Sequence, residues 1–338
     1  MRRKYIIALF LLFAFSSCAP KDNAYKSTRV IMGTYVTITA ERGELPEIVV
    51  RAAVADAFKE VERVDRLMST YKPESELSEV NREAGIRPVK VDPEVLAAAG
   101  YALDVARMTD GAFDATVGPL VRLWGIGGDS PKVPTPAEIE RARALVDYRQ
   151  VELDRAAGTV FIRKKGMSLD LGGIAKGYAS DLAVDMLKKR GIKGGIVAVA
   201  GDLKLFGSRA DGSPWKIGIQ HPRNKDAIMA KVELTDGATS TSGDYERFFI
   251  RDGVRYCHIL DPKTGYPAHG LISVTVIAKE SYLADSLATG LFVLGQKKAG
   301  AFAEGHPEVE VLLVDAGGNV TATGRFRRLG QKLSSSPR

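Results

Sequence analysis

The chain has 338 residues, of which 45% are hydrophobic and 26% are charged, so it can bury a large core in one large or two moderate domains. Its net charge of +7 is mild and scattered along the sequence. No basic stripe with interleaved aromatic residues accompanies this charge, which argues against nucleic acid as a partner.

The first eighteen residues resemble the signal peptide of a bacterial lipoprotein. Met1–Lys4 is a charged start, and the apolar run Tyr5–Phe15 is short for a membrane span. The segment Phe15–Cys18 is similar to a lipobox, in which small residues precede the cysteine that receives the lipid. We therefore expect residues 1–18 to be the signal peptide, Cys18 to be lipidated, and the protein to be anchored to the inner or outer membrane, facing the periplasm. A simple cleaved signal peptide is the alternative.

The elements expected in the first half of the chain are mostly helices. Residues 19–27 are expected to be a polar tether, followed by a strand signal at Thr28–Ala40. Apolar residues recur on one face of Glu47–Met68, which predicts a long helix. Further helical segments are expected at Ser75–Asn81 (a turn or short helix), Pro93–Thr109, a turn ending at Leu123–Gly125, and Pro136–Leu145.

The second half is expected to be richer in strands. They are predicted at Thr159–Ile162, Met167–Leu171, Gly195–Leu205, Trp215–Ile219, Ala230–Leu234, Arg247–Ile250, Leu271–Ile277, Val309–Val314 and Val320–Ala322. Helices are predicted after Gly173 as far as Arg190, and at Tyr282–Leu294. Helices and strands alternate irregularly and several strands form hairpins, so we predict a mixed α+β fold and not a doubly wound sheet.

The segment Asp170–Asp181 stands out as a candidate ligand site. Gly172 and Gly173 occupy a predicted turn between a strand and a helix, where the backbone can approach a ligand and free N–H groups favour an anion. Asp170 ends the strand, and Lys176 enters the first turn of the helix. A tight packing turn with no ligand is the alternative, because the spacing is not that of a P-loop.

Six segments of the chain, taken together and in order, resemble the ApbE family of FAD:protein FMN transferases. They are Met32–Thr34, Gly111–Asp114, Asp170–Tyr178, Thr241–Tyr245, His258–Gly265 and Ala284–Thr289. The resemblance runs over residues 28–324 and implies one ApbE-like domain, with packed helices and largely antiparallel sheets, followed by a loose tail at residues 325–338.

The resemblance also implies the positions of a flavin site. The residues that would contact or line the site of the flavin nucleotide are Met32, Tyr71, Ala112, Phe113, Asp114, Asp170, Lys176 and the backbone of Ile259. His258 is a candidate acceptor for the hydroxyl proton, and the alternative for it is a histidine hydrogen-bonded into a turn.

A magnesium site is implied by the same resemblance. Its ligands would be the carbonyl of Gly173 and the side chains of Asp285 and Thr289, with Asp285 counted among the catalytic residues. Residues four apart on a helix share a face, and hard oxygen ligands suit Mg²⁺. An ordinary solvated pair on an exposed helix face is the alternative.

The implied reaction is Mg²⁺-dependent transfer of FMN from FAD to a threonine or serine hydroxyl of an exported acceptor protein, with release of AMP. Such an acceptor would be a subunit of a redox-driven ion pump or a flavin-carrying reductase. Two alternatives remain open: Mg²⁺-dependent hydrolysis of FAD to FMN and AMP, and a flavin-binding lipoprotein without activity.

Overall fold

The computed structural model describes residues 23–327, so the predicted signal peptide, Cys18 and most of the predicted tail lie outside the described residues. The helices are α1 (Glu47–Met68), α2 (Glu76–Arg82), α3 (Pro93–Met108), α4 (Gly118–Trp124), α5 (Pro136–Arg143), α6 (Ala175–Lys189) and α7 (Ser281–Gly305). Short 3₁₀ turns occur at Tyr148–Gln150 and Gly324–Phe326.

The strands of the described chain fall into one large sheet and three small ones. The large sheet has eight strands in the order β1-β2-β6-β7-β10-β13-β14-β15, and every neighbouring pair is antiparallel. Its members are β1 (Ala24–Ile31), β2 (Thr34–Glu41), β6 (Gly195–Val199), β7 (Asp202–Phe206), β10 (Gly237–Gly243), β13 (Leu271–Ala278), β14 (Glu310–Asp315) and β15 (Val320–Ala322). The small sheets contain β3 (Val89–Lys90), β5 (Thr159–Ile162) and β4 (Val151–Asp154); β8 (Trp215–His221) and β9 (Asn224–Leu234); and β11 (Phe248–Arg251) and β12 (Val254–Cys257).

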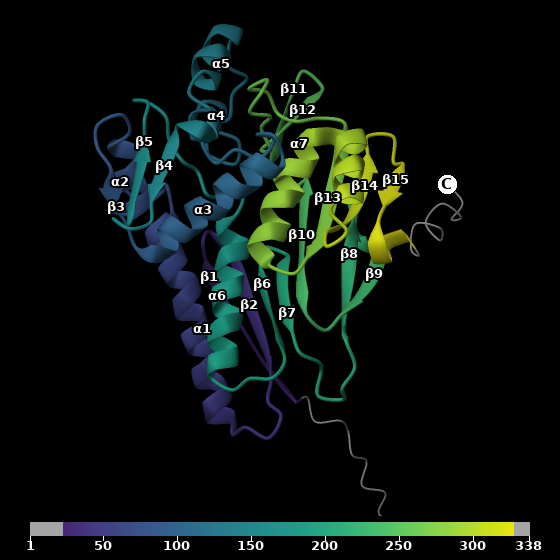
Figure 1. The fold of residues 1–338 in the computed structure, drawn as a ribbon. Coiled ribbons are helices and arrows are strands. Elements are labelled where there is room, and N and C mark those ends of the chain that lie inside the picture. Colours follow the sequence, from purple (N-terminus) through teal and green to yellow (C-terminus); the bar gives the residue numbers. More distant parts are fainter. Residues whose placement is uncertain (1–22, 328–338) are drawn as a thin grey trace, which may run out of the picture.

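Helices α1, α6 and α7 lie side by side against one face of the large sheet (Figure 1). The apolar face predicted for α1 is buried, including Val50, Val54, Phe58 and Val61. Each such side chain contributes about 1.5–3 kcal/mol when it leaves water. The hairpin β8–β9 forms a second, smaller apolar cluster that includes Trp215 and Phe326. The mixed α+β prediction with largely antiparallel sheets is confirmed.

Two predicted strands are in fact tight hairpins of the large sheet. The Thr28–Ala40 signal divides into β1 and β2 around Met32 and Gly33, whose φ angles are 56° and 66°. Two consecutive positive φ values reverse a chain in two residues. Gly195–Leu205 divides in the same way into β6 and β7 at Ala200–Gly201. Strand β1 begins at Ala24, inside the segment expected to be a tether.

Two further regions differ in secondary structure from the prediction. Met167–Leu171 is not a strand but a buried extended segment, because Asn81 accepts from the N–H of Leu169 and donates to its carbonyl. The stretch from Thr239 onward, where no strand was predicted, belongs to the central strand β10, which runs from Gly237 to Gly243. The helix predicted at Tyr282–Leu294 is confirmed: α7 is helical up to a break at Gly295, where φ is 73°, and a further helical segment runs to Gly305. None of the helices between residues 23 and 327 has the length and hydropathy of a membrane span.

Candidate active site

The start of α7 is held against α6 by a glycine and a carboxylate. A Cβ atom on Gly177 would lie 2.2 Å from the carbonyl oxygen of Ser281, so only glycine permits this approach of the two helices. Asp181 of α6 accepts hydrogen bonds from the N–H groups of Ser281 and Tyr282, both at 2.9 Å. A carboxylate at a helix N-terminus satisfies free N–H groups and complements the helix dipole. These contacts fix α7, the helix that carries Asp285 and Thr289.

The ammonium group of Lys176 lies between two buried carboxylates. Its Nζ is 2.7 Å from Asp285 Oδ1 and 2.7 Å from Asp202 Oδ2. Asp285 and Asp202 are only 3% and 5% exposed. The second oxygen of Asp285 accepts from the N–H of Gly177 at 3.1 Å, and the second oxygen of Asp202 accepts from Ser240 Oγ at 2.5 Å.

The charges of this cluster are strongly coupled. Burial raises the pKa of Asp285 to about 6, and the Asp202 carboxylate acts in the same direction, while Lys176 opposes both. Burial lowers the pKa of Lys176, but the two carboxylates outweigh burial and the net pKa is raised. With both aspartates ionised and the lysine protonated, the three side chains carry a net charge of −1.

The predicted metal-binding residues Gly173, Asp285 and Thr289 lie together. Thr289 Oγ1 is 3.4 Å from the carbonyl of Asp285 one turn earlier and 3.3 Å from Ser242 Oγ on β10. A Cβ atom on Gly173 would lie 3.6 Å from Thr289 Oγ1 and 3.1 Å from the ring of Phe113. The structure thus brings the Gly172–Gly173 turn, β10 and α7 to one point.

The oxygen atoms at this point suit a hard cation. A carboxylate, two hydroxyls and a nearby backbone carbonyl are available, and Mg²⁺ binds through one or two protein carboxylates while it keeps waters and takes phosphate oxygens. Between residues 23 and 327 there is no cluster of three histidine, cysteine, aspartate or glutamate side chains that could hold a metal. A divalent ion here would therefore depend on hydroxyl, carbonyl, water and substrate oxygens besides Asp285.

Asp170 lies beside the glycine turn and two arginines. Its Oδ1 accepts from the N–H of Gly172 at 2.8 Å. Burial raises the pKa of Asp170, and the charges of Arg122 and Arg247 act in the opposite direction. Arg122 also donates to Ser168 Oγ at 2.7 Å. Asp170 therefore shapes the turn and is itself within the field of two cations.

Both carboxylate oxygens of Asp114 accept hydrogen bonds from neighbouring residues of the protein. Oδ1 accepts from the N–H and the hydroxyl of Thr116 at 2.8 and 2.6 Å, and Oδ2 accepts from the N–H of Tyr148 at 3.0 Å. Burial raises its pKa, and these hydrogen bonds oppose that shift. Asp114 therefore holds the loop that carries Ala112 and Phe113, both of which are buried.

His258 is half-buried and its imidazole is neutral at physiological pH. Its Nδ1 lies 3.2 Å from the carbonyl oxygen of Arg247, which can only accept, so Nδ1 carries the proton and Nε2 is left with a lone pair. Burial lowers the pKa of His258 to about 4, and the charges of Arg247 and Lys176 add to this effect. The carbonyl of the next residue, Ile259, accepts from Ala268 N–H at 2.8 Å.

Met32 and Tyr71 lie outside the hydrogen-bonded cluster around Lys176 in the described chain. Met32 occupies the β1–β2 turn and is half-buried, whereas Tyr71 is 86% exposed. Neither side chain makes a hydrogen bond or ring contact with Lys176 or Asp285 in the described part of the molecule.

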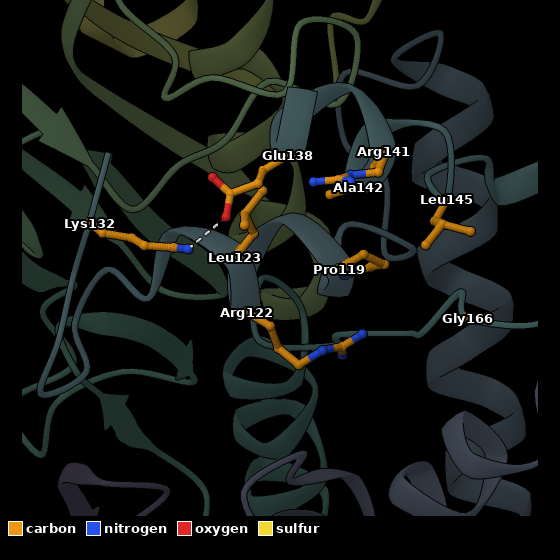
Figure 2. Close-up of a pocket in the computed structure, with 9 residues that line it drawn as sticks. All are labelled: Pro119, Arg122, Leu123, Lys132, Glu138, Arg141, Ala142, Leu145 and Gly166. Carbon is orange, nitrogen blue, oxygen red and sulfur yellow. Dashed lines mark hydrogen bonds and ion pairs between the residues drawn. The ribbon is translucent and has the colours of Figure 1, made fainter. Parts of the chain in front are cut away.

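A groove of about 470 Å³ lies over α4 and α5, outside the cluster around Lys176 (Figure 2). Its lining residues are Pro119, Arg122, Leu123, Lys132, Glu138, Arg141, Ala142, Leu145 and Gly166. Two of these residues, Lys132 and Glu138, form an ion pair at 3.0 Å. Arg122 connects the groove to the candidate site, since it also acts on Asp170.

Sequence reasoning missed three polar residues of the site. Asp202 follows the β6–β7 turn, and Ser240 and Ser242 alternate along β10, so both serines face the same side of the strand. The serine- and threonine-rich stretch around Ser240 and Ser242 is a weak sequence signal for these residues. Such a stretch, without alternating apolar residues, can form a strand beside a polar site. Asp202 has no local pattern that singles it out.

The fold and this site define an α+β protein with an antiparallel sheet and a buried site of oxygen donors and a lysine. The model of the ApbE family matches residues 32–313. An FAD:protein FMN transferase from Vibrio cholerae is 33% identical over 338 residues, which cover 96% of this chain and 98% of that protein. A Treponema pallidum protein of the same name is 35% identical, over 91% and 90% of the two chains.

Solved structures agree with this assignment. The crystal structure of the ApbE protein from Thermotoga maritima matches with a TM-score of 0.84 and 35% identity, and the match covers 91% of this chain and 99% of that one. The flavin transferase ApbE from Vibrio cholerae matches with a TM-score of 0.81 and 33% identity, over 90% and 98% of the chains. The chain therefore belongs to the ApbE family, and its activity is that of an FAD:protein FMN transferase.

Proposed function

We propose that this enzyme transfers FMN from FAD to a threonine or serine hydroxyl of an exported acceptor protein and depends on Mg²⁺. The observation that carries the proposal is the buried cluster in which Lys176 lies between Asp202 and Asp285, beside the oxygen atoms of Thr289 and the glycine turn. A site that combines hard oxygen donors with a lysine suits a pyrophosphate and its cation.

Gly173, through its carbonyl, and Asp285 and Thr289, through their side chains, would hold the ion. When bound, Mg²⁺ would neutralise charge on the pyrophosphate of FAD and orient it. Lys176 has three ammonium protons and donates two of them to Asp202 and Asp285, so one remains for a phosphate oxygen.

His258 would accept the proton of the attacking hydroxyl at Nε2. Its low pKa keeps the imidazole neutral, and the hydrogen bond from Nδ1 to Arg247 holds the ring. The acceptor oxygen would form a bond to the phosphorus of the FMN half of FAD. The bond from that phosphorus to the AMP oxygen would break, so the products would be a protein–FMN phosphodiester and AMP.

Product analysis tests this proposal. The enzyme is incubated with FAD and Mg²⁺, with and without a purified, flavin-free acceptor domain of a bacterial redox-driven ion pump. We expect AMP to accumulate with the acceptor and to match the flavin bound to it, with little free FMN. Equal amounts of free FMN and AMP, with no flavin on the acceptor, would instead indicate hydrolysis of FAD.

We also propose that the enzyme acts as a lipoprotein on the periplasmic side of the membrane, with Cys18 lipidated. The lipobox-like segment Phe15–Cys18 supports this proposal.

A further inference from the structure

We infer that the ammonium group of Lys176 competes with Mg²⁺ for Asp285. Asp202 acts as a positioning residue, because it holds this ammonium group and so sets the strength of the competition. The inference rests on the proposed function, since it concerns the same site. Its basis is that Lys176 Nζ contacts Asp285 Oδ1, an oxygen of the predicted metal ligand, at 2.7 Å.

The lysine is held on Asp285 by more than one contact. Asp202 also contacts the same ammonium at 2.7 Å, and Ser240 fixes Asp202 through its other oxygen. The Lys176 side chain is 27% exposed, whereas both carboxylates are buried. An ion pair with so little exposure is only weakly screened by water and salt.

A divalent cation that approaches Asp285 therefore meets a fixed positive charge within contact distance of its ligand. Two like charges a few ångströms apart repel by several kcal/mol at the effective dielectric constant of a protein site. Asp202 offsets this repulsion, because it shares the ammonium and supplies a second negative charge. The charge of the Asp202–Lys176–Asp285 group, −1 in total, thus tunes the affinity for Mg²⁺ to an intermediate value.

This reasoning predicts opposite effects for two substitutions in one cluster. Lys176→Gln removes the positive charge and keeps a hydrogen-bond donor, so Mg²⁺ should bind on the order of tenfold or more tightly. Asp202→Asn leaves Lys176 to neutralise Asp285 alone, so Mg²⁺ should bind on the order of tenfold or more weakly. The double variant restores the net charge of −1 and should bind Mg²⁺ with nearly the wild-type affinity.

Lys204 provides a matched control. It is also a buried lysine between two carboxylates, 3.0 Å from Asp181 and 2.7 Å from Glu280, but it has no contact with Asp285. Lys204→Gln removes the same charge near the same two helices, so it should lower the stability of the fold without a comparable gain in Mg²⁺ affinity.

The test is calorimetric titration of the purified protein with MgCl₂, without FAD, at mildly alkaline pH, together with the unfolding temperature of each variant. The inference predicts the affinity order Lys176→Gln, then wild type and double variant together, then Asp202→Asn. Weaker binding in both single variants would overturn it, since that is the result of a purely structural role. An equal gain in Lys204→Gln would also overturn it.

If wild type binds Mg²⁺ but the order fails, only this inference is lost. If wild type and Lys176→Gln both fail to bind Mg²⁺, the proposed metal site is lost with it.

Should Lys176→Gln fail to fold, Lys176→Arg replaces it in the comparison. Arginine keeps the positive charge, so the Mg²⁺ affinity of this variant should stay at or below that of wild type. A gain in affinity in Lys176→Arg would contradict the inference.

Discussion

Replacing Asp285 with asparagine removes one negative charge from the candidate site and leaves the shape of the side chain nearly unchanged. The alternative that the sequence left open was an exposed helix face, where such a change alters stability by at most about 0.5 kcal/mol. The structure contradicts that alternative, because Asp285 is 3% exposed and accepts from both Lys176 and Gly177.

The effect on stability can be worked out from these contacts. Loss of one member of a buried ion pair costs about 3–5 kcal/mol when the other charge is stranded. Here Lys176 keeps its contact with Asp202, and asparagine still accepts one hydrogen bond. The burial that raises the pKa of Asp285 also makes its charge costly in the folded state. We therefore expect a loss of about 1–3 kcal/mol, the range of buried hydrogen bonds.

The effect on activity should be larger. Without the carboxylate, Mg²⁺-dependent FMN transfer should fall on the order of a hundredfold, or about 2.7 kcal/mol of transition-state stabilisation. Urea unfolding measures the first quantity, and the rate of acceptor flavinylation over a series of Mg²⁺ concentrations measures the second.

Ser286→Ala is the matched control on the same helix. Ser286 is fully buried and donates to the Tyr282 carbonyl at 2.7 Å, so its loss should cost about 1 kcal/mol of stability and leave the Mg²⁺ response unchanged. Folded Asp285→Asn protein with normal activity and normal Mg²⁺ response would refute the assignment of Asp285 as a ligand.

Three further predictions concern the metal, the base and the membrane. Thr289→Val should raise the Mg²⁺ concentration needed for half-maximal transfer, by less than Asp285→Asn does. The effects of the two substitutions should not add fully, because both act through one ion. Full additivity in the double variant would argue against a shared ion. His258 must be neutral to accept a proton, and its pKa is lowered to about 4, so its protonation removes this function only as the pH falls through about 4. An NMR titration of the imidazole should place its midpoint near 4, and a midpoint near the ordinary value would contradict the burial argument. Cys18→Ser should release the protein from the detergent phase in a Triton X-114 partition, and wild-type protein found without lipid in the aqueous phase would contradict the lipoprotein prediction.

The fold was predictable where each element carries its own periodicity. The apolar face of α1 and the hairpin β14–β15 follow from spacing alone. The predicted boundaries of strands were wrong where the backbone conformation of a single residue decides them. At Met32, a φ of 56° in a residue other than glycine makes a turn inside an apparently continuous strand signal. Strand β10 was missed because its serines and threonines face polar partners and not an apolar core.

The candidate site was predictable in part. The resemblance named Gly173, Asp285 and Thr289, and the structure brings these residues together. It could not reveal the partners of Lys176, because Asp202 and Asp285 are 26 and 109 residues away in the sequence and only the sheet and the α6–α7 contact bring them together. For Asp114, the resemblance named a residue that lines the ligand site, and the structure adds that both of its oxygens hold the surrounding loop.

The intact mass of an acceptor domain, measured after incubation with this enzyme, FAD and Mg²⁺, shows whether FMN is transferred to protein. We expect a mass increase equal to FMN less one water, on a single threonine or serine, with one AMP released for each acceptor modified. The increase should be absent when Mg²⁺ is chelated. An acceptor of unchanged mass, in a reaction where FAD is nevertheless consumed to FMN and AMP, would show that the enzyme hydrolyses FAD and does not transfer FMN.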